Sequence, residues 1–82
     1  MQTYRHIQSH QLNEIDIMID VAVDGTAWVR RLNSADHEGC LPLREAVAKA
    51  HNFKVLDPTA GEIVVHLQDG AEWDHRLGDL VN

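Results

Sequence analysis

Apolar and polar residues alternate strictly between residues 15 and 23 of the chain. The odd positions are all isoleucine or valine, and the even positions are aspartate, methionine or alanine. A period of two predicts a β-strand with one buried side and one solvent-facing side. The next two residues, Asp24-Gly25, are a strong hairpin signal. We therefore predict a hairpin over residues 15–32, with the isoleucines in the core and the aspartates in water.

The register of this hairpin depends on the length of its turn. A two-residue turn at Asp24-Gly25 pairs Val21 with Trp28 and buries the tryptophan against the isoleucines. A three-residue turn with a bulge at Gly25 places Ala27 there instead. We favour the first register because it buries the larger side chain.

Weaker patterns predict the remaining elements. Helical spacing predicts one helix over residues 42–51, with Pro42 in the first position, and alternation predicts a strand over residues 62–68. Residues 33–41 form a predicted polar loop. A short strand or extended return is predicted over residues 53–56, and a last strand over residues 71–74.

The order of these elements predicts one small α+β domain over residues 1–82. We expect an antiparallel or mixed sheet in a ββαββ-like order, with the helix packed on one face. Residues 1–12 are expected to form a flexible arm or a short edge strand.

Two short segments resemble known families. The hairpin–helix–strand order, with L-R-E-A-V-A inside the helix, resembles β-grasp sulfur carriers. The segment H-E-G-C, followed by a helix with E-A-V, is similar to the strand–loop–helix junction of HicB-type antitoxins. The first likeness implies a helix on a mixed sheet, and the second implies a partner-binding module.

The charge balance narrows the classes of partner. The net charge is −6, and residues 57–82 hold six carboxylates and one arginine. An acidic chain is poorly suited to neutralise the phosphates of nucleic acids or anionic membranes, but it suits a basic protein partner. The single cysteine excludes an internal disulfide, and the first ten residues contain no apolar signal segment. Both features predict a cytoplasmic protein.

An acidic row is the main candidate for a partner-binding surface. Asp16, Asp20 and Asp24 recur every four residues, about 13 Å apart on a strand, which is too sparse to imitate consecutive phosphates. Further carboxylates in the second half of the chain would thicken this surface. We expect Trp28 to be core and Trp73 to be partly exposed. The residues expected to bind a partner are Asp16, Asp20, Asp24, Glu72, Trp73 and Asp74.

Candidates for catalysis or metal binding are few. His37 and Cys40 have zinc-like spacing, but a structural zinc site needs four ligands, and only one pair is evident. The same pair is the only candidate for a nucleophile and its base, without an oxyanion-hole motif. We expect no catalytic residue, no metal ligand and no cofactor.

The sequence therefore predicts a non-enzymatic protein-interaction module, an inhibitor or accessory protein. It would bind another protein through its acidic surface and a sheet edge, and a phage-type inhibitor of a nucleic-acid-binding machine fits this description. One alternative is a metal-binding or redox module that uses His37, Cys40 and other histidines. Another is an antitoxin-like domain or a self-associating one, with a homodimer formed through an edge strand.

Overall fold

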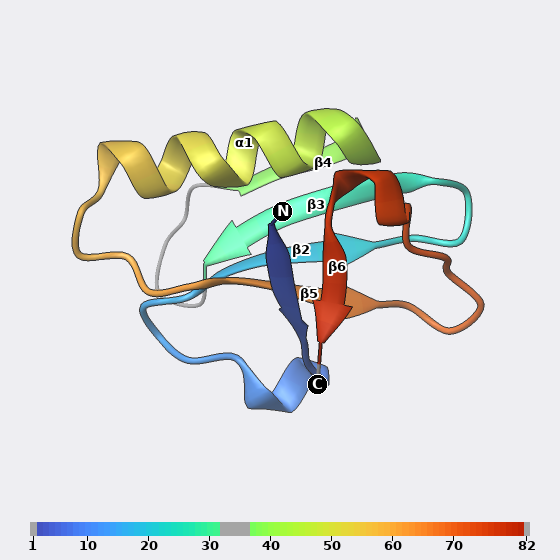
Figure 1. Ribbon diagram of the computed structural model, residues 1–82, viewed down its shortest axis with the longest axis horizontal. Coiled ribbons are helices and arrows are strands. Elements are labelled where there is room, and N and C mark those ends of the chain that lie inside the picture. The colour runs from blue at the N-terminus through green and yellow to red at the C-terminus, as the bar shows by residue number, and fades with distance from the viewer. Residues whose placement is uncertain (1, 32–36, 82) are drawn as a thin grey trace.

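A six-stranded mixed sheet and one helix make up the fold (Figure 1). The computed structural model describes residues 2–31 and 37–81, and describes residues 9, 37 and 38 by their backbone alone. The predicted α+β class is confirmed, with more strands than the sequence indicated. The elements are β1 (Thr3–His6), a 3₁₀ turn η1 (Ser9–Gln11), β2 (Ile17–Val21), β3 (Thr26–Arg31), β4 (His37–Pro42), α1 (Leu43–Leu56), β5 (Ile63–Leu67), a 3₁₀ turn η2 (His75–Leu77) and β6 (Asp79–Val81).

The strand order across the sheet is β4-β3-β2-β5-β1-β6. β2, β3 and β4 form an antiparallel meander, whereas β5 runs parallel to β2. β1 is parallel to both of its neighbours, β5 and β6. In Figure 1, β1 and β6 cross β2 and β5 at a steep angle, so the sheet is strongly twisted.

β2 is buried on both faces, which corrects the prediction that its even positions face water. Ile17 and Ile19 are fully buried in the core cluster that contains the buried residues of α1. Met18, on the other face, is 4% exposed and packs with Ile7 and Val64. The segment after β1 therefore covers the face that the pattern assigned to solvent.

Among the odd positions of residues 15–23, only those within β2 are buried. Ile15 and Val23 lie just outside β2 and are 57% and 65% exposed. The prediction that the whole alternating segment is core is therefore wrong at both ends.

The hairpin adopts the register that we did not favour. Ile19 pairs with Val29 and Val21 with Ala27, and the Ala22 N–H donates to the Thr26 carbonyl across a three-residue turn. This register puts Trp28 opposite Asp20, on the face away from α1. This register is explained by the small residues that it places under α1. Ala27 and Val29 are fully buried in the same cluster as the alanines of the helix.

α1 extends five residues beyond the predicted end at residue 51, and it begins after Pro42, which is its N-cap residue and not its first helical residue. Ala46, Val47 and Ala50 are buried against the sheet, and Phe53 continues this stripe where an extended return was predicted. The helix ends at Asp57-Pro58, since a residue before proline disfavours the helical conformation.

Part of the predicted polar loop is a strand. Residues 37–42 form β4, and residues 32–36 lie outside the described part of the chain. Opposite Trp28, β4 has a bulge in which Cys40 takes a positive φ of 58°. The half-buried Trp28 ring lies so close to Gly39 that a Cβ there would overlap it. Glycine at this position thus lets the indole lie flat on the strand.

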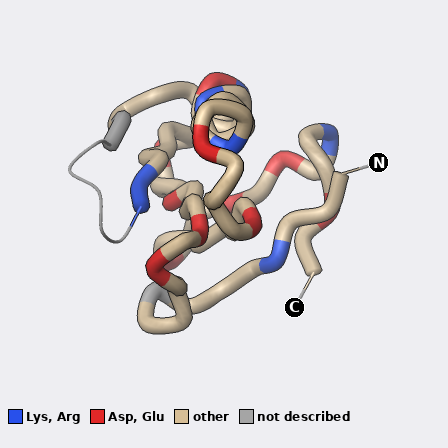
Figure 2. Tube along the Cα trace, turned by 90° about the vertical axis from the view of Figure 1, so that its left-hand side faces the viewer, with Lys and Arg blue, Asp and Glu red and all other residues tan. Residues whose placement is uncertain are grey.

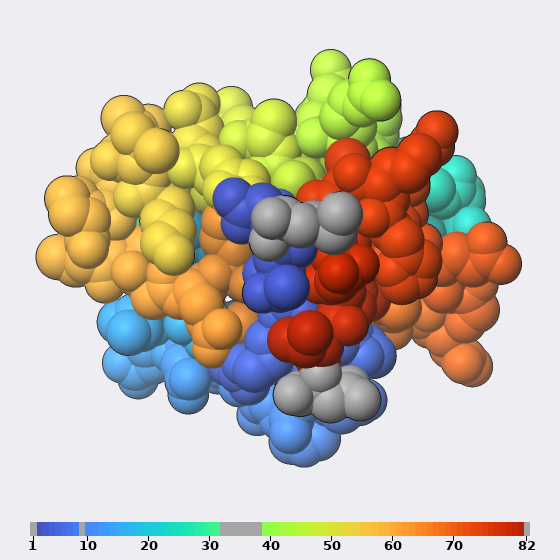
Figure 3. All heavy atoms as spheres, in the orientation of Figure 1, coloured from blue at the N-terminus to red at the C-terminus, as the bar shows by residue number. Residues whose placement is uncertain are grey.

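For the elements other than β2, β3, β4 and α1, the sequence predictions hold in part. β5 occupies the predicted position, but residues 71–74 form no strand, and the last strand is β6. β1 is present but is not an edge strand, because β6 pairs with its outer side (Figures 1 and 3). Within the described residues, the structure contains no helix with the length and apolar character needed to cross a membrane.

The contact between Gly39 and Trp28 gives a first prediction. Gly39→Ala should destabilise the protein by about 1–3 kcal/mol, because the new methyl group displaces the indole ring. A lowered urea midpoint would measure this loss. In a Trp28→Leu background the same substitution should cost much less. An equal cost in both backgrounds would show that the ring is not the cause.

Candidate functional site

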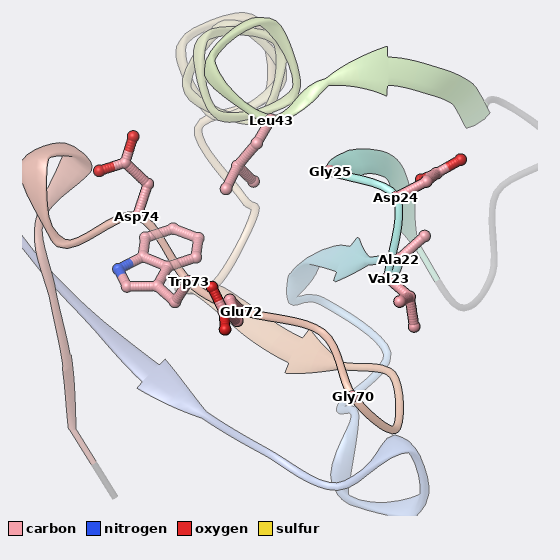
Figure 4. A pocket seen from close by; sticks show the side chains of 9 residues that line it. All are labelled: Ala22, Val23, Asp24, Gly25, Leu43, Gly70, Glu72, Trp73 and Asp74. Carbon is pink, nitrogen blue, oxygen red and sulfur yellow. The ribbon is translucent and has the colours of Figure 1, made fainter.

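A pocket of about 630 Å³ opens at the end of the sheet where β2 and β5 finish (Figure 4). The β2–β3 turn, residues 22–25, lines one side, and the segment after β5 lines the other with Gly70 and residues 72–74. Leu43, the first residue of α1, lies above them. The volume is within the range of ligand sites in proteins.

Trp73 forms the rigid apolar wall of the pocket. The residue is 8% exposed, and its indole N–H donates to the Gly78 carbonyl at 2.8 Å. Its ring also meets the Tyr4 ring edge-on, with 5.6 Å between centroids. Because both contacts hold the indole in place, this wall is formed before any ligand arrives. The prediction that Trp73 is partly exposed and Trp28 is core is therefore wrong.

Asp24 lies on the hairpin side and is engaged within its own turn. Its carboxylate accepts from the Thr26 hydroxyl at 2.6 Å and from the Thr26 backbone N–H at 3.0 Å. These two bonds lower the pKa of Asp24 below its usual range. Gly25 next to it has a φ of 87°, which closes the turn. Asp24 therefore contributes a permanent negative charge but already has hydrogen-bond partners.

Asp74 lies on the opposite side and is likewise engaged. It caps η2 by accepting from the Arg76 backbone N–H, and its carboxylate also binds the Arg76 guanidinium. The hydrogen bonds from the Arg76 side chain and backbone hold the pKa of Asp74 below its usual range, and the nearby charge of Arg44 adds to this effect.

Glu72 is the carboxylate that the fold leaves available. It is exposed and makes no hydrogen bond or ion pair with any part of the chain that the structure describes. In Figure 4 the carboxylates of Asp24 and Asp74 lie at the two ends of the pocket, and Glu72, the neighbour of Trp73 in the chain, lines the same pocket. A carboxylate without a partner in the described structure and a fixed indole therefore line the same pocket, an arrangement suited to a cation with an apolar stem.

Four of the six predicted partner-binding residues line this one pocket, namely Asp24, Glu72, Trp73 and Asp74. Asp16 and Asp20 lie elsewhere. Figure 2 shows the acidic residues spread over several strands and turns and not gathered in a single stripe. The predicted acidic row along one strand therefore does not form a surface.

Asp16 is a structural residue. It is 3% exposed, and its Oδ1 accepts from the Glu62 backbone N–H at 3.1 Å. Its Oδ2 has no hydrogen-bond partner in the described structure and lies 3.7 Å from an Arg5 guanidinium nitrogen. A carboxylate this buried is not available to a partner.

Asp20 is held by His66. The two side chains lie next to each other on adjacent strands, and Asp20 Oδ1 is 2.8 Å from His66 Nδ1. Their exposed side-chain fractions are 13% and 20%. The contact gives each of these two largely buried polar side chains a partner inside the sheet. Asp20, like Asp16, is therefore withdrawn from solvent.

The remaining lining residues, Ala22, Val23, Gly25, Leu43 and Gly70, and the Asp74 partner Arg76 were missed, although the sequence holds one signal for the site. Asp24-Gly25 and Asp69-Gly70 each follow an apolar strand. Once these strands are parallel neighbours, both turns must lie at the same end of the sheet. The sequence alone does not show that they are parallel.

The alternative of a metal-binding or redox module, which would use His37, Cys40 and other histidines, gains no support from the described residues. They contain no group of three or more histidine, cysteine, aspartate or glutamate side chains arranged to hold a metal ion. Cys40 is exposed on β4, and the side chain of His37 lies outside the described part.

Comparison with protein-family models, with curated proteins and with solved structures gives no match. The function has to be inferred from the pocket and its residues.

The engaged carboxylates predict an acid-sensitive fold. Asp57, just after α1, is engaged in the same way, because it accepts from the Thr59 hydroxyl and backbone N–H and from the Arg31 guanidinium. The pKa values of Asp24, Asp57 and Asp74 are all lowered by such bonds in the folded state, from about 4 in the unfolded chain. Their stabilisation is therefore complete above about pH 4 and is lost as the pH falls through their folded-state pKa values. The melting temperature should fall between pH 5 and pH 2.5.

The matched variant is the triple Asp→Asn substitution at these positions, since an amide keeps an acceptor oxygen and does not titrate. Its melting temperature should depend less steeply on pH over the same interval. An unchanged slope would show that other groups cause the acid sensitivity.

Proposed function

We propose that the protein is a non-enzymatic protein-interaction module, an inhibitor or accessory protein, that binds a basic segment of another protein in this pocket. The observation that carries the proposal is that the Glu72 carboxylate, which has no partner in the described structure, and the fixed indole of Trp73 line the same pocket. A lysine or arginine side chain has the matching form, with a charged head and an apolar stem.

Electrostatics supports a cationic ligand over an anionic one. The beginning of α1 has a partial positive charge of about half a unit. Three carboxylates that line the pocket outweigh this partial charge, namely those of Asp24, Glu72 and Asp74. Within the described residues, only Asp74 of these three is paired with an arginine. The net charge of −6 adds long-range attraction for a basic partner. Proteins that bind nucleic acids present such basic segments, so they are the target class that we propose.

The sheet edges are the weaker candidates for the contact. β4 has a bulge and ends in Pro42, and β6 has only three residues. Bulges, prolines and short edge strands all hinder pairing with another chain. The proposal therefore places the partner in the pocket, and the antitoxin-like or self-associating alternative depends on edges that pair poorly.

A capped Arg-Leu-Arg tripeptide is the probe for this proposal. Its binding should shift the NMR signals of the Trp73 indole N–H and of residues 22–25 and 70–74, and should weaken with added salt. Glu72→Gln should weaken the binding about fivefold, which corresponds to one partly exposed charge pair of about 1 kcal/mol.

Two controls separate a specific contact from general charge attraction. Glu14→Gln makes the same change in charge at an exposed position outside the pocket and should leave binding nearly unchanged. A tripeptide with citrulline in place of arginine keeps the shape without the charge and should not bind. Equal loss in the two variants, or binding of the citrulline peptide, would contradict the proposal.

A further inference from the structure

Arg76 places one of the chain's own cations at the edge of the pocket. Its Nε lies 3.0 Å from Asp74 Oδ1, and its Nη2 lies 3.0 Å from Asp74 Oδ2. This is the two-point geometry with which an arginine binds a carboxylate. Asp74 lines the pocket, so one of the pocket's carboxylates already binds a guanidinium of the chain itself.

The Arg76 side chain is poorly anchored apart from this ion pair. It is 87% exposed, whereas the Asp74 side chain is 34% exposed. The backbone N–H of Arg76 makes its own bond to Asp74 Oδ1 at 3.0 Å, so η2 stays capped when the side chain leaves. Exchange of the guanidinium therefore requires no change in the backbone.

We propose that Arg76 is an internal competitor, which occupies Asp74 until an arginine of the partner displaces it. This inference rests on the proposed function and adds the order of events. A first basic side chain binds the free carboxylate of Glu72 against Trp73. A second one gains Asp74 only when the Arg76 side chain leaves. The pocket thereby favours partners with two neighbouring basic side chains over partners with one.

The test compares Arg76→Gln with Lys54→Gln in binding of the capped Arg-Leu-Arg tripeptide. Both variants remove one positive charge from an exposed position. Lys54 is eleven residues beyond Leu43 on α1, about 16 Å along the helix, where physiological salt screens its charge. Arg76→Gln should raise the affinity about threefold or more, and Lys54→Gln should change it by much less.

An Asp74→Asn background separates competition from a general effect of charge. Asparagine can still cap η2, but it no longer holds the guanidinium. There, Arg76→Gln should have no larger effect than Lys54→Gln. If Arg76→Gln matches Lys54→Gln in the native background too, the competitor role is wrong while the pocket stands. If the tripeptide binds neither the native protein nor any variant, the proposed function fails and the inference fails with it.

Discussion

Burial of β2 on both faces is the constraint on which the other parts of the structure depend. The strand lies between an antiparallel neighbour, β3, and a parallel one, β5. Each of its three fully buried side chains, Ile17, Ile19 and Val21, contributes about 1.5–3 kcal/mol. α1 must cover one face, and the segment after β1 must cover the other, because either face left open would expose this apolar surface.

The pocket is a by-product of the same arrangement. Parallel pairing brings the ends of β2 and β5 to one end of the sheet, and each strand there runs into a turn that contains Asp-Gly. α1 begins above this end, so Leu43 closes the third side. The core therefore fixes the position of the site and, through Trp73, its aromatic wall, while its negative charge comes from turn residues outside the core, above all Glu72.

The sequence predicted the positions of single strands better than the residues that pack against them from elsewhere in the chain. Alternation correctly indicated β2 and β5, because a period of two depends only on neighbouring residues. It could not show that Asp16 and Asp20 are withdrawn from water, since their partners, Glu62 and His66, each lie 46 residues further along the chain. The hairpin register was wrong for a related reason, since the alanines of α1 and not the size of Trp28 decide which residues fit beneath the helix. Four of the nine residues that line the candidate site were thus predicted from the sequence, but the pocket that they form was not.

The position of β1 has a consequence for how the protein reaches its fold. The first strand pairs with β5 on one side and with β6 on the other, so both neighbours come from residues after 62. Its buried Tyr4 consequently has no lasting place until the rest of the sheet exists. Contacts this distant in sequence slow folding. During synthesis on the ribosome, β1 emerges before β5 and β6, so it would be among the last strands to find its place and would remain open to chaperones until then.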